Sequence, residues 1–139
     1  MNGVIAVRSL LVVDTGVTAL VPVAQIVAGA LPQGSGLPAI SLMSVSSTDR
    51  NVPAPGPKRR VTERVQVTVL AASYPAAKAI IRAVRAAAAD RMPAIDGLTD
   101  VTVHTDSAGP DFLDEETGIH MQTQDFRVSF NEARLASPS

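Results

Sequence analysis

The fold is decided by residues 60–91, which read RVTERVQVTVLAASYPAAKAIIRAVRAAAADR. In the first half, valines at 65, 67 and 69 alternate with polar residues, which is the side-chain period of a strand with one buried face. After Ser73 the apolar residues recur at helical spacing, and lysine and arginine occupy another side of the helical wheel. The stretch therefore predicts an antiparallel strand followed by an amphipathic helix over residues 75–90.

Local signals define the start of this helix and require a partner for its apolar side. Ser73 can cap the free N–H groups, and Pro75 falls in the first turn, where a missing donor costs nothing. Burying Ile80, Ile81 and Val84 would stabilise the fold by roughly 1.5–3 kcal/mol for each side chain. The helix is therefore expected to lie on a sheet.

The rest of the chain supplies that sheet and one further helix. The spacing of apolar residues predicts a helix at 3–12, bent at Asp14 into a short second turn, and strands at 23–28, 37–47, 61–73, 100–105 and 119–131. The last strand changes its apolar phase, which predicts a bulge or bend near Gln124 and Asp125. The element order predicts an α+β fold, a mostly antiparallel sheet of four to five strands carrying both helices.

Length and composition indicate one domain. A chain of 139 residues has the size of a single domain, which we place at residues 1–132, with a mobile proline-rich arm at 48–60 and a disordered tail at 133–139. Cysteine is absent, which excludes disulfides and thiolate metal ligands. The apolar runs are interrupted before they reach membrane-spanning length, so no membrane partner is expected.

Charge is nearly balanced overall but unevenly placed. A net charge of −1 argues against a protein built to neutralise nucleic acid, and 3% aromatic residues are too few for a base-stacking surface. Two blocks of opposite sign stand out and are the candidate interface residues: basic Arg50, Lys58, Arg59, Arg60 and Arg64, and acidic Asp111, Asp114, Glu115 and Glu116.

Three patterns resemble catalytic or metal sites. Asp14-Thr15-Gly16 matches the catalytic string of aspartic proteases, but one copy would require a homodimer, and a helix cap at Asp14 is the favoured interpretation. His104 and His120 lack the spacing of metal ligands, and the acidic block lacks that of a calcium-binding EF-hand. No catalytic residue, cofactor or metal site is predicted.

Several strings, taken in order, resemble one known family. They are Val7-Arg8-Ser9-Leu10-Leu11 through Asp14, Val17-Thr18-Ala19-Leu20-Val21, Ala30-Leu31-Pro32-Gln33-Gly34, Leu37-Pro38-Ala39-Ile40, Val65-Gln66-Val67-Thr68-Val69, the helix Ala76 to Ala89, and Gln124-Asp125-Phe126-Arg127-Val128. Together they resemble the tail completion family of tailed bacteriophages, over roughly residues 3–131. Related proteins occur in prophages and gene transfer agents.

The resemblance implies a structural virion protein with no enzyme activity and no cofactor. Such proteins form a homohexameric ring at the head-proximal end of the tail, made in the bacterial host cytoplasm, which terminates the tail tube, joins it to the head, or does both. The implied partners are copies of the chain, the tail tube protein, the head–tail connector or neck proteins, and DNA passing through the lumen without sequence-specific contact.

The charge blocks suggest how such a ring could close. A ring uses a heterologous contact, in which one patch meets a different patch on the next subunit. We expect the acidic loop at 111–116 to face a basic surface of its neighbour, drawn from Arg59, Arg60 and Arg64 or from Lys78, Arg82 and Arg85 of the helix. The arm at 50–60 is expected to dock on the tube or neck. Two alternatives remain, a protease-like homodimer and a small α+β domain with a closed apolar ligand pocket.

Overall fold

The structure is a computed structural model that describes residues 2–31, 36–50 and 56–133. The helical elements are α1 (Asn2–Val13), α2 (Thr15–Thr18), a 3-10 turn η1 (Val23–Gln25) and α3 (Tyr74–Ala88). The strands are β1 (Ile26–Ala28), β2 (Ala39–Arg50), β3 (Lys58–Ala71), β4 (Leu98–Ala108), β5 (Phe112–Asp114) and β6 (Ile119–Ala133). The α+β class is confirmed.

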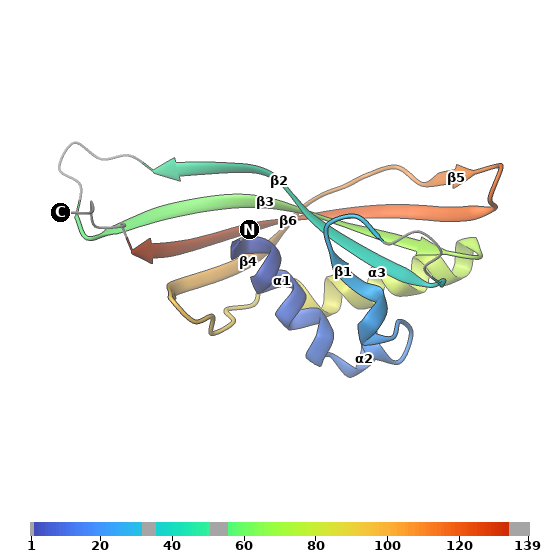
Figure 1. Cartoon of the computed structure of the whole chain (residues 1–139), viewed down its shortest axis with the longest axis horizontal. Coiled ribbons are helices and arrows are strands. Elements are labelled where there is room, and N and C mark those ends of the chain that lie inside the picture. Colours follow the sequence, from blue (N-terminus) through green and yellow to red (C-terminus); the bar gives the residue numbers. More distant parts are fainter. Residues whose placement is uncertain (1, 32–35, 51–55, 134–139) are drawn as a thin grey trace.

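The strands form one long, twisted sheet with the helices on one side (Figure 1). Its order is β1-β2-β3-β6-β4, and β5 pairs with the far end of β6. All pairings are antiparallel except that of β1 with β2. The described residues form six strands rather than four to five, because β5 is a three-residue strand inside the predicted loop, too short to show a period of two. The predicted strand at 23–28 begins as the turn η1.

The core lies between this sheet and the helices. Val65, Val67 and Val69 of β3 are fully buried, and Ile80 and Val84 of α3 pack in the same cluster. The bent N-terminal helix is confirmed as α1 and α2, which contribute Val4, Val7, Leu11 and Val17 to the core. The alternation and the helical stripe therefore bury the faces that the sequence predicts.

Both predicted helix caps are present. Asp14 is the N-cap of α2, and its Oδ1 accepts a hydrogen bond from the Val17 N–H at 3.0 Å. Ser73 caps α3, since its Oγ accepts from the Ala76 N–H at 3.3 Å. Each cap satisfies a donor that has no partner within its own helix.

The strands β2 and β3 extend into both ends of the predicted arm at 48–60. Thr48–Arg50 and Arg60–Thr62 pair as antiparallel strands, so the β2–β3 hairpin extends beyond the part of the sheet that the helices cover. Every side chain of Met43–Arg50 is exposed, and a strand with no buried face shows no apolar alternation in its sequence. Residues 51–55, at the tip of the predicted arm, and residues 134–139, in the predicted tail, lie outside the described residues.

The irregularity predicted near Gln124 and Asp125 lies in the partner strand and not in β6 itself. β6 pairs with β3 in unbroken register from Ala133 to His120, whereas the register of β4 with β6 shifts opposite these residues, between Thr105 and Ala108, and again between Thr99 and Thr102. The apolar phase changes because Gln122 and Gln124 occupy buried positions on the helix side of β6. The Gln124 amide nitrogen donates to the Asp125 carbonyl oxygen at 2.9 Å, which satisfies this buried donor. Polar residues thus occupy buried positions of β6 while its register with β3 stays unchanged.

Candidate assembly surfaces

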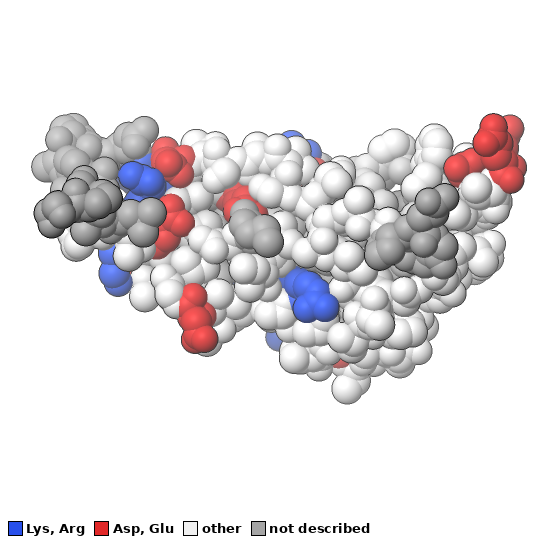
Figure 2. Space-filling view, viewed as in Figure 1, with Lys and Arg blue, Asp and Glu red and all other residues white. Residues whose placement is uncertain are grey.

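The two charge blocks lie near opposite ends of the sheet. The acidic block surrounds the β5–β6 turn at one end of the long axis, and Figure 2 shows acidic atoms gathered there. The other end is formed by the β2–β3 hairpin and carries Arg50, Lys58, Arg59 and Arg60. The separation arises because β3 and β6 span the molecule in antiparallel register. We call Glu115 and Glu116 the acidic tip, and Lys58 and Arg59 the basic end.

Within the acidic block, Asp111 is held by the N-terminal turn of α3. Its carboxylate accepts a hydrogen bond from the Tyr74 hydroxyl at 2.9 Å and pairs with the Lys78 ammonium at 3.0 Å. The same ammonium lies 5.2 Å from the centre of the Tyr74 ring. Tyr74 in turn meets the His120 ring edge-on, with centroids 6.3 Å apart. These contacts join the loop before β5 to α3 and β6.

The contacts of Asp111 shift the pKa of two groups. The Lys78 hydrogen bond, followed by that of Tyr74, lowers the pKa of Asp111. The Asp111 hydrogen bond raises the pKa of Lys78, against a smaller opposing effect of desolvation. Both shifts favour the charged forms, so the pair is an internal ion pair at neutral pH.

The remaining acidic residues divide into a turn residue and two exposed glutamates. The Asp114 side chain accepts from the Glu116 N–H at 3.1 Å, and its carbonyl oxygen accepts from the Gly118 N–H at 2.7 Å. Asp114 therefore shapes the turn. Glu115 and Glu116 are exposed, and their carboxylates make no ion pair within the described chain.

The basic end is held more loosely. Arg59 lies 3.9 Å from Asp49, and the Lys58 ammonium donates to the Thr99 hydroxyl at 3.3 Å. Arg60 is the better-anchored residue, because its guanidinium donates to the Asp100 carbonyl oxygen at 2.8 Å. Exposed pairs of this kind contribute only about 0–1 kcal/mol each, so Lys58 and Arg59 can exchange their contacts for those of a partner.

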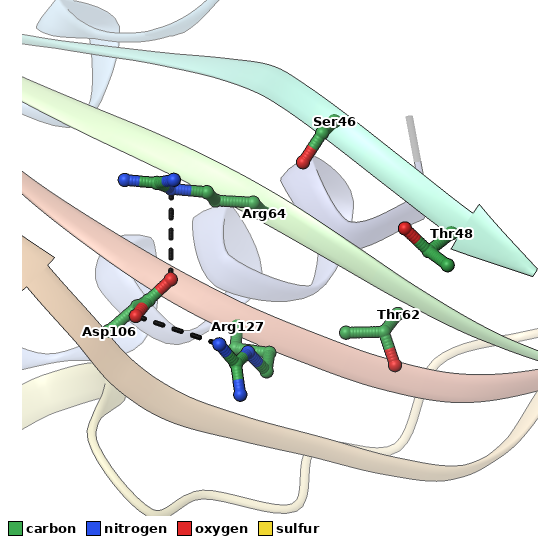
Figure 3. A pocket seen from close by; sticks show the side chains of 6 residues that line it. All are labelled: Ser46, Thr48, Thr62, Arg64, Asp106 and Arg127. Carbon is green, nitrogen blue, oxygen red and sulfur yellow. Dashed lines mark ion pairs between the residues drawn. The ribbon is translucent and has the colours of Figure 1, made fainter.

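Arg64 lies on the exposed face of the sheet, opposite the helices, rather than at the basic end. Two of its nitrogens contact Asp125 Oδ2, at 2.6 and 2.7 Å, and a third ion-pair distance of 3.7 Å joins it to Asp106. Asp106 also lies 3.8 Å from Arg127. Figure 3 marks the ion pairs that join Arg64 of β3 and Arg127 of β6 to Asp106. Four charges are thus neutralised within one subunit.

These charges border a hollow of about 430 Å³ on the exposed face. Hydroxyls of Ser46, Thr48 and Thr62 line the rest of it (Figure 3). The hollow is polar, whereas the alternative of a small-molecule-binding domain predicted a closed apolar pocket. Sequence reasoning missed Asp106, Asp125 and Arg127, because their proximity depends on pairing β4 and β3 with β6. The sequence did contain one signal for this surface: the polar residues that alternate with the valines of β3 must face the side of the sheet opposite the core.

The residues weighed as catalytic or metal-binding are dispersed. Asp14 borders a hollow of about 180 Å³ with Leu10, Val13, Ala87 and Arg91, and none of these described residues is a second carboxylate. His104 Nδ1 lies 2.8 Å from the exposed Asp90 carboxylate. Among the described residues, no cluster of three or more His, Asp or Glu could hold a metal ion. Within the same residues, no helix is both long and apolar enough to cross a membrane.

Comparisons with known proteins agree with this architecture. The family model described as "Tail completion protein gp17" matches residues 5–130. Among solved structures, a chain from the "Virion of native gene transfer agent (GTA) particle" superposes with a TM-score of 0.73 and 20% sequence identity, covering 94% of this chain and 96% of that chain. A search of curated proteins finds no match. The family match confirms the resemblance, and the chain belongs to the tail completion protein gp17 family.

Proposed function

We propose that this protein assembles into a homohexameric ring at the head-proximal end of the tail, where it terminates the tail tube, joins it to the head connector, or does both. The family match supports the location, since its description names tail completion. The observation that supports the ring is the placement of the exposed Glu115 and Glu116 at one end of one elongated sheet and of Lys58 and Arg59 at the other (Figure 1). A contact between unlike ends is heterologous, which is the kind of contact that closes rings.

In this ring, the acidic tip of one subunit faces the basic end of the next. Glu115 and Glu116 are suited to this role because no ion pair within the described chain engages them, whereas Asp111 and Arg64 are already paired. Ion pairs at such exposed positions set the orientation of subunits, and apolar contacts supply most of the binding free energy. The basic side of α3, formed by Arg82 and Arg85, is the competing surface for the same carboxylates, and both arginines are exposed.

A charge-swap experiment tests the contact. Glu115→Lys with Glu116→Lys, and separately Lys58→Glu with Arg59→Glu, should each reduce ring formation and tail completion. Combining all four substitutions in one chain should restore both, because each contact regains opposite charges. The readouts are native mass of the protein assembled with purified tail tubes and the titre of complete particles. Asp114 is left intact because reversing it would also disturb the turn.

The matched control reverses the competing surface. The double variant Arg82→Glu with Arg85→Glu is combined with Glu115→Lys and Glu116→Lys. If this combination restores ring formation and the combination with the basic-end variant does not, the acidic tip contacts α3 of the neighbour and not its basic end. Rings that form normally in every charge variant would rule out the electrostatic contact. A protein that remains monomeric on tail tubes in its wild-type form would rule out the ring.

The exposed face of the sheet fits the proposed passage of DNA through the lumen. Its best-held arginine, Arg64, is paired with the buried carboxylate of Asp125 in the same subunit. Neutralised arginines bind phosphates weakly, because a phosphate contact must displace the carboxylate. A lumen wall of this composition would let DNA slide without sequence-specific contact.

A further inference from the structure

An apolar row borders the acidic tip on the exposed face of the sheet. Leu70 of β3 pairs with Met121 of β6, and Met121 pairs in turn with Phe112 of β5. Directly opposed side chains lie on the same face of a sheet. Leu70 alternates with the buried residues of β3, so the row faces away from the helices. We call Leu70, Phe112 and Met121 the apolar row.

The apolar row stands out because the rest of this face is polar or charged. On β3 the residues of the same phase that precede Leu70 are Thr62, Arg64, Gln66 and Thr68. Phe112 is nevertheless 58% exposed. The neighbouring Glu115 and Glu116 make no ion pair within the described chain. A partner that covers this place must therefore bring both apolar surface and positive charge.

The opposite end of the same face carries two arginines side by side. Arg50 and Arg60 are direct cross-strand partners in the β2–β3 pairing, and like charges in this position repel each other. Arg60 donates to the Asp100 carbonyl oxygen and to the Asn131 side-chain oxygen, neither of which is charged. Arg50 is exposed, and its guanidinium has no hydrogen bond or ion pair to any described residue. This end therefore lacks a carboxylate partner.

We infer that Arg50 of one subunit lies over the apolar row of the next subunit, with its side chain against Phe112 and its charge beside Glu115 and Glu116. An arginine suits both parts of this surface. Its aliphatic stem covers apolar groups, and its guanidinium is attracted to the face of an aromatic ring within about 6 Å.

The occupant of the apolar row is a second copy of the chain because the charges of its two ends are complementary. Two arginines without a carboxylate at one end would meet two glutamates without a cation at the other, which relieves the repulsion within each pair. The inference rests on the proposed ring. It adds an aromatic anchor to a contact for which Lys58 and Arg59 supply only exposed ion pairs.

A double-mutant cycle tests the contact. Arg50→Ala and Phe112→Ala should each weaken ring association on purified tail tubes roughly tenfold, because each removes one side of the same contact. The variant with both substitutions should associate as well as the weaker single variant, since no contact is left for the second substitution to remove. Sedimentation over a range of protein concentrations measures the association. Two losses that multiply would overturn the inference, because the residues would then contact different partners.

Two exposed residues away from the contact provide matched controls. Met92 is 75% exposed, and Arg127 is the direct partner of Arg64 on the same face as Arg50. Met92→Ala and Arg127→Ala should leave ring association unchanged, and thermal unfolding of every variant checks that it is folded. An Arg50→Ala variant that forms rings normally but lowers the titre of complete particles would place Arg50 against DNA or another virion protein. That result would also overturn the inference.

Paired cysteines give a second test that does not depend on affinity. The chain has no cysteine, and positions 50 and 112 lie at opposite ends of the sheet in one subunit (Figure 1). A chain with Arg50→Cys and Phe112→Cys, treated on tail tubes with a short bis-maleimide crosslinker, should give a ladder of covalent multimers. Arg127→Cys with Phe112→Cys is the control and should give none.

Native mass of the same samples before crosslinking reports separately on the ring. Rings that form without covalent multimers would overturn the contact of Arg50 with the apolar row and leave the proposed ring in place. Absence of rings from the wild-type protein would overturn both.

Discussion

Gly3 is the residue at which the first helix approaches the sheet most closely. A Cβ atom at Gly3 would lie 2.6 Å from Glu63 Oε2 and 3.0 Å from a Val65 methyl group. Glu63 is 2% exposed, so its carboxylate cannot swing into solvent to make room. The glycine is therefore needed for close packing of α1 on β3.

Gly3→Ala should destabilise the protein by about 1–3 kcal/mol, the usual cost of inserting a group into a packed site. Gly56→Ala is the control, because a Cβ at Gly56 meets nothing within 4 Å. Urea unfolding of both variants would measure the difference. Equal stability of the two variants would show that α1 can shift away from β3 at little cost.

Asp111 illustrates how a surface residue can be held by its neighbours. The hydrogen bond from Lys78 lowers its pKa, so the folded state binds a proton less readily than the unfolded chain does. The resulting stability is present above the unfolded pKa, about 3.9 for aspartate, and is lost as pH falls through the lower folded pKa. For Lys78 the sign is reversed, and its contribution is lost as pH rises through its raised folded pKa.

In Lys78→Met, the pKa of Asp111 should rise toward its ordinary value, because the first-ranked cause of the shift is removed. Carboxyl titration by NMR would measure it. Arg82→Met, which replaces a neighbouring cation on α3 that has no contact with Asp111, should leave the Asp111 titration unchanged. An unaltered pKa in the Lys78 variant would mean that the pair does not form in solution.

At the scale of elements, the exposed face of the sheet is held by a charge pair between β3 and β6. Asp125 is 5% exposed and depends on Arg64, whereas Arg127 is exposed and reaches Asp106 only at 3.8 Å. Removing the partner of a buried carboxylate lowers the free energy of unfolding more than removing an exposed ion pair does, because the buried charge is left with neither solvent nor hydrogen-bond donors around it. The two arginines on one face should therefore differ in their effect.

Arg64→Met should reduce the free energy of unfolding by about 1–3 kcal/mol, the range for hydrogen bonds to a charged group. Arg127→Met should cost under about 1 kcal/mol, as exposed pairs do. Adding Asp125→Asn to the Arg64 variant should recover part of the loss, since the unpaired charge is gone. Thermal unfolding of the three variants and wild type measures this, and equal losses for the two single arginine variants would contradict the assignment.

At the scale of the whole molecule, the separation of charge along the sheet has a consequence for assembly. Exposed ion pairs between subunits are screened by salt, with a Debye length of about 10 Å at 0.1 M and about 3 Å at 1 M. Contacts between apolar surfaces respond little or strengthen under the same change. The salt response thus separates the two contributions to a ring.

Raising salt from about 0.1 M to about 1 M should lower the fraction of protein in rings on tail tubes. Glu115→Gln with Glu116→Gln should form fewer rings at low salt and show a weaker salt response. Sedimentation at matched protein concentrations gives the measurement. A wild-type ring population that is constant across this range would show that the acidic tip and the basic end do not meet.

The sequence predicts more of the fold than of the candidate assembly surfaces. The valine alternation of β3, the stripe of α3 and the two caps were predictable because each depends on residues close in the chain. The pairing of Arg64 with Asp125, 61 positions apart, required the β3–β6 register. The strand ends at 48–50 and 58–60 were missed because their side chains lack a buried face.

The sequence by itself determined the α+β class, the core face of each long element and the tail completion resemblance, since local periodicity and ordered strings carry that information. Only the tertiary structure decided which charges are neutralised within the subunit and which remain available for partners. The reason is that antiparallel pairing carries some residues of a charge block to the far end of the sheet and places others beside an opposite charge. Arg64 with Asp125 and Lys78 with Asp111 became internal pairs, while Glu115 and Glu116 stayed exposed.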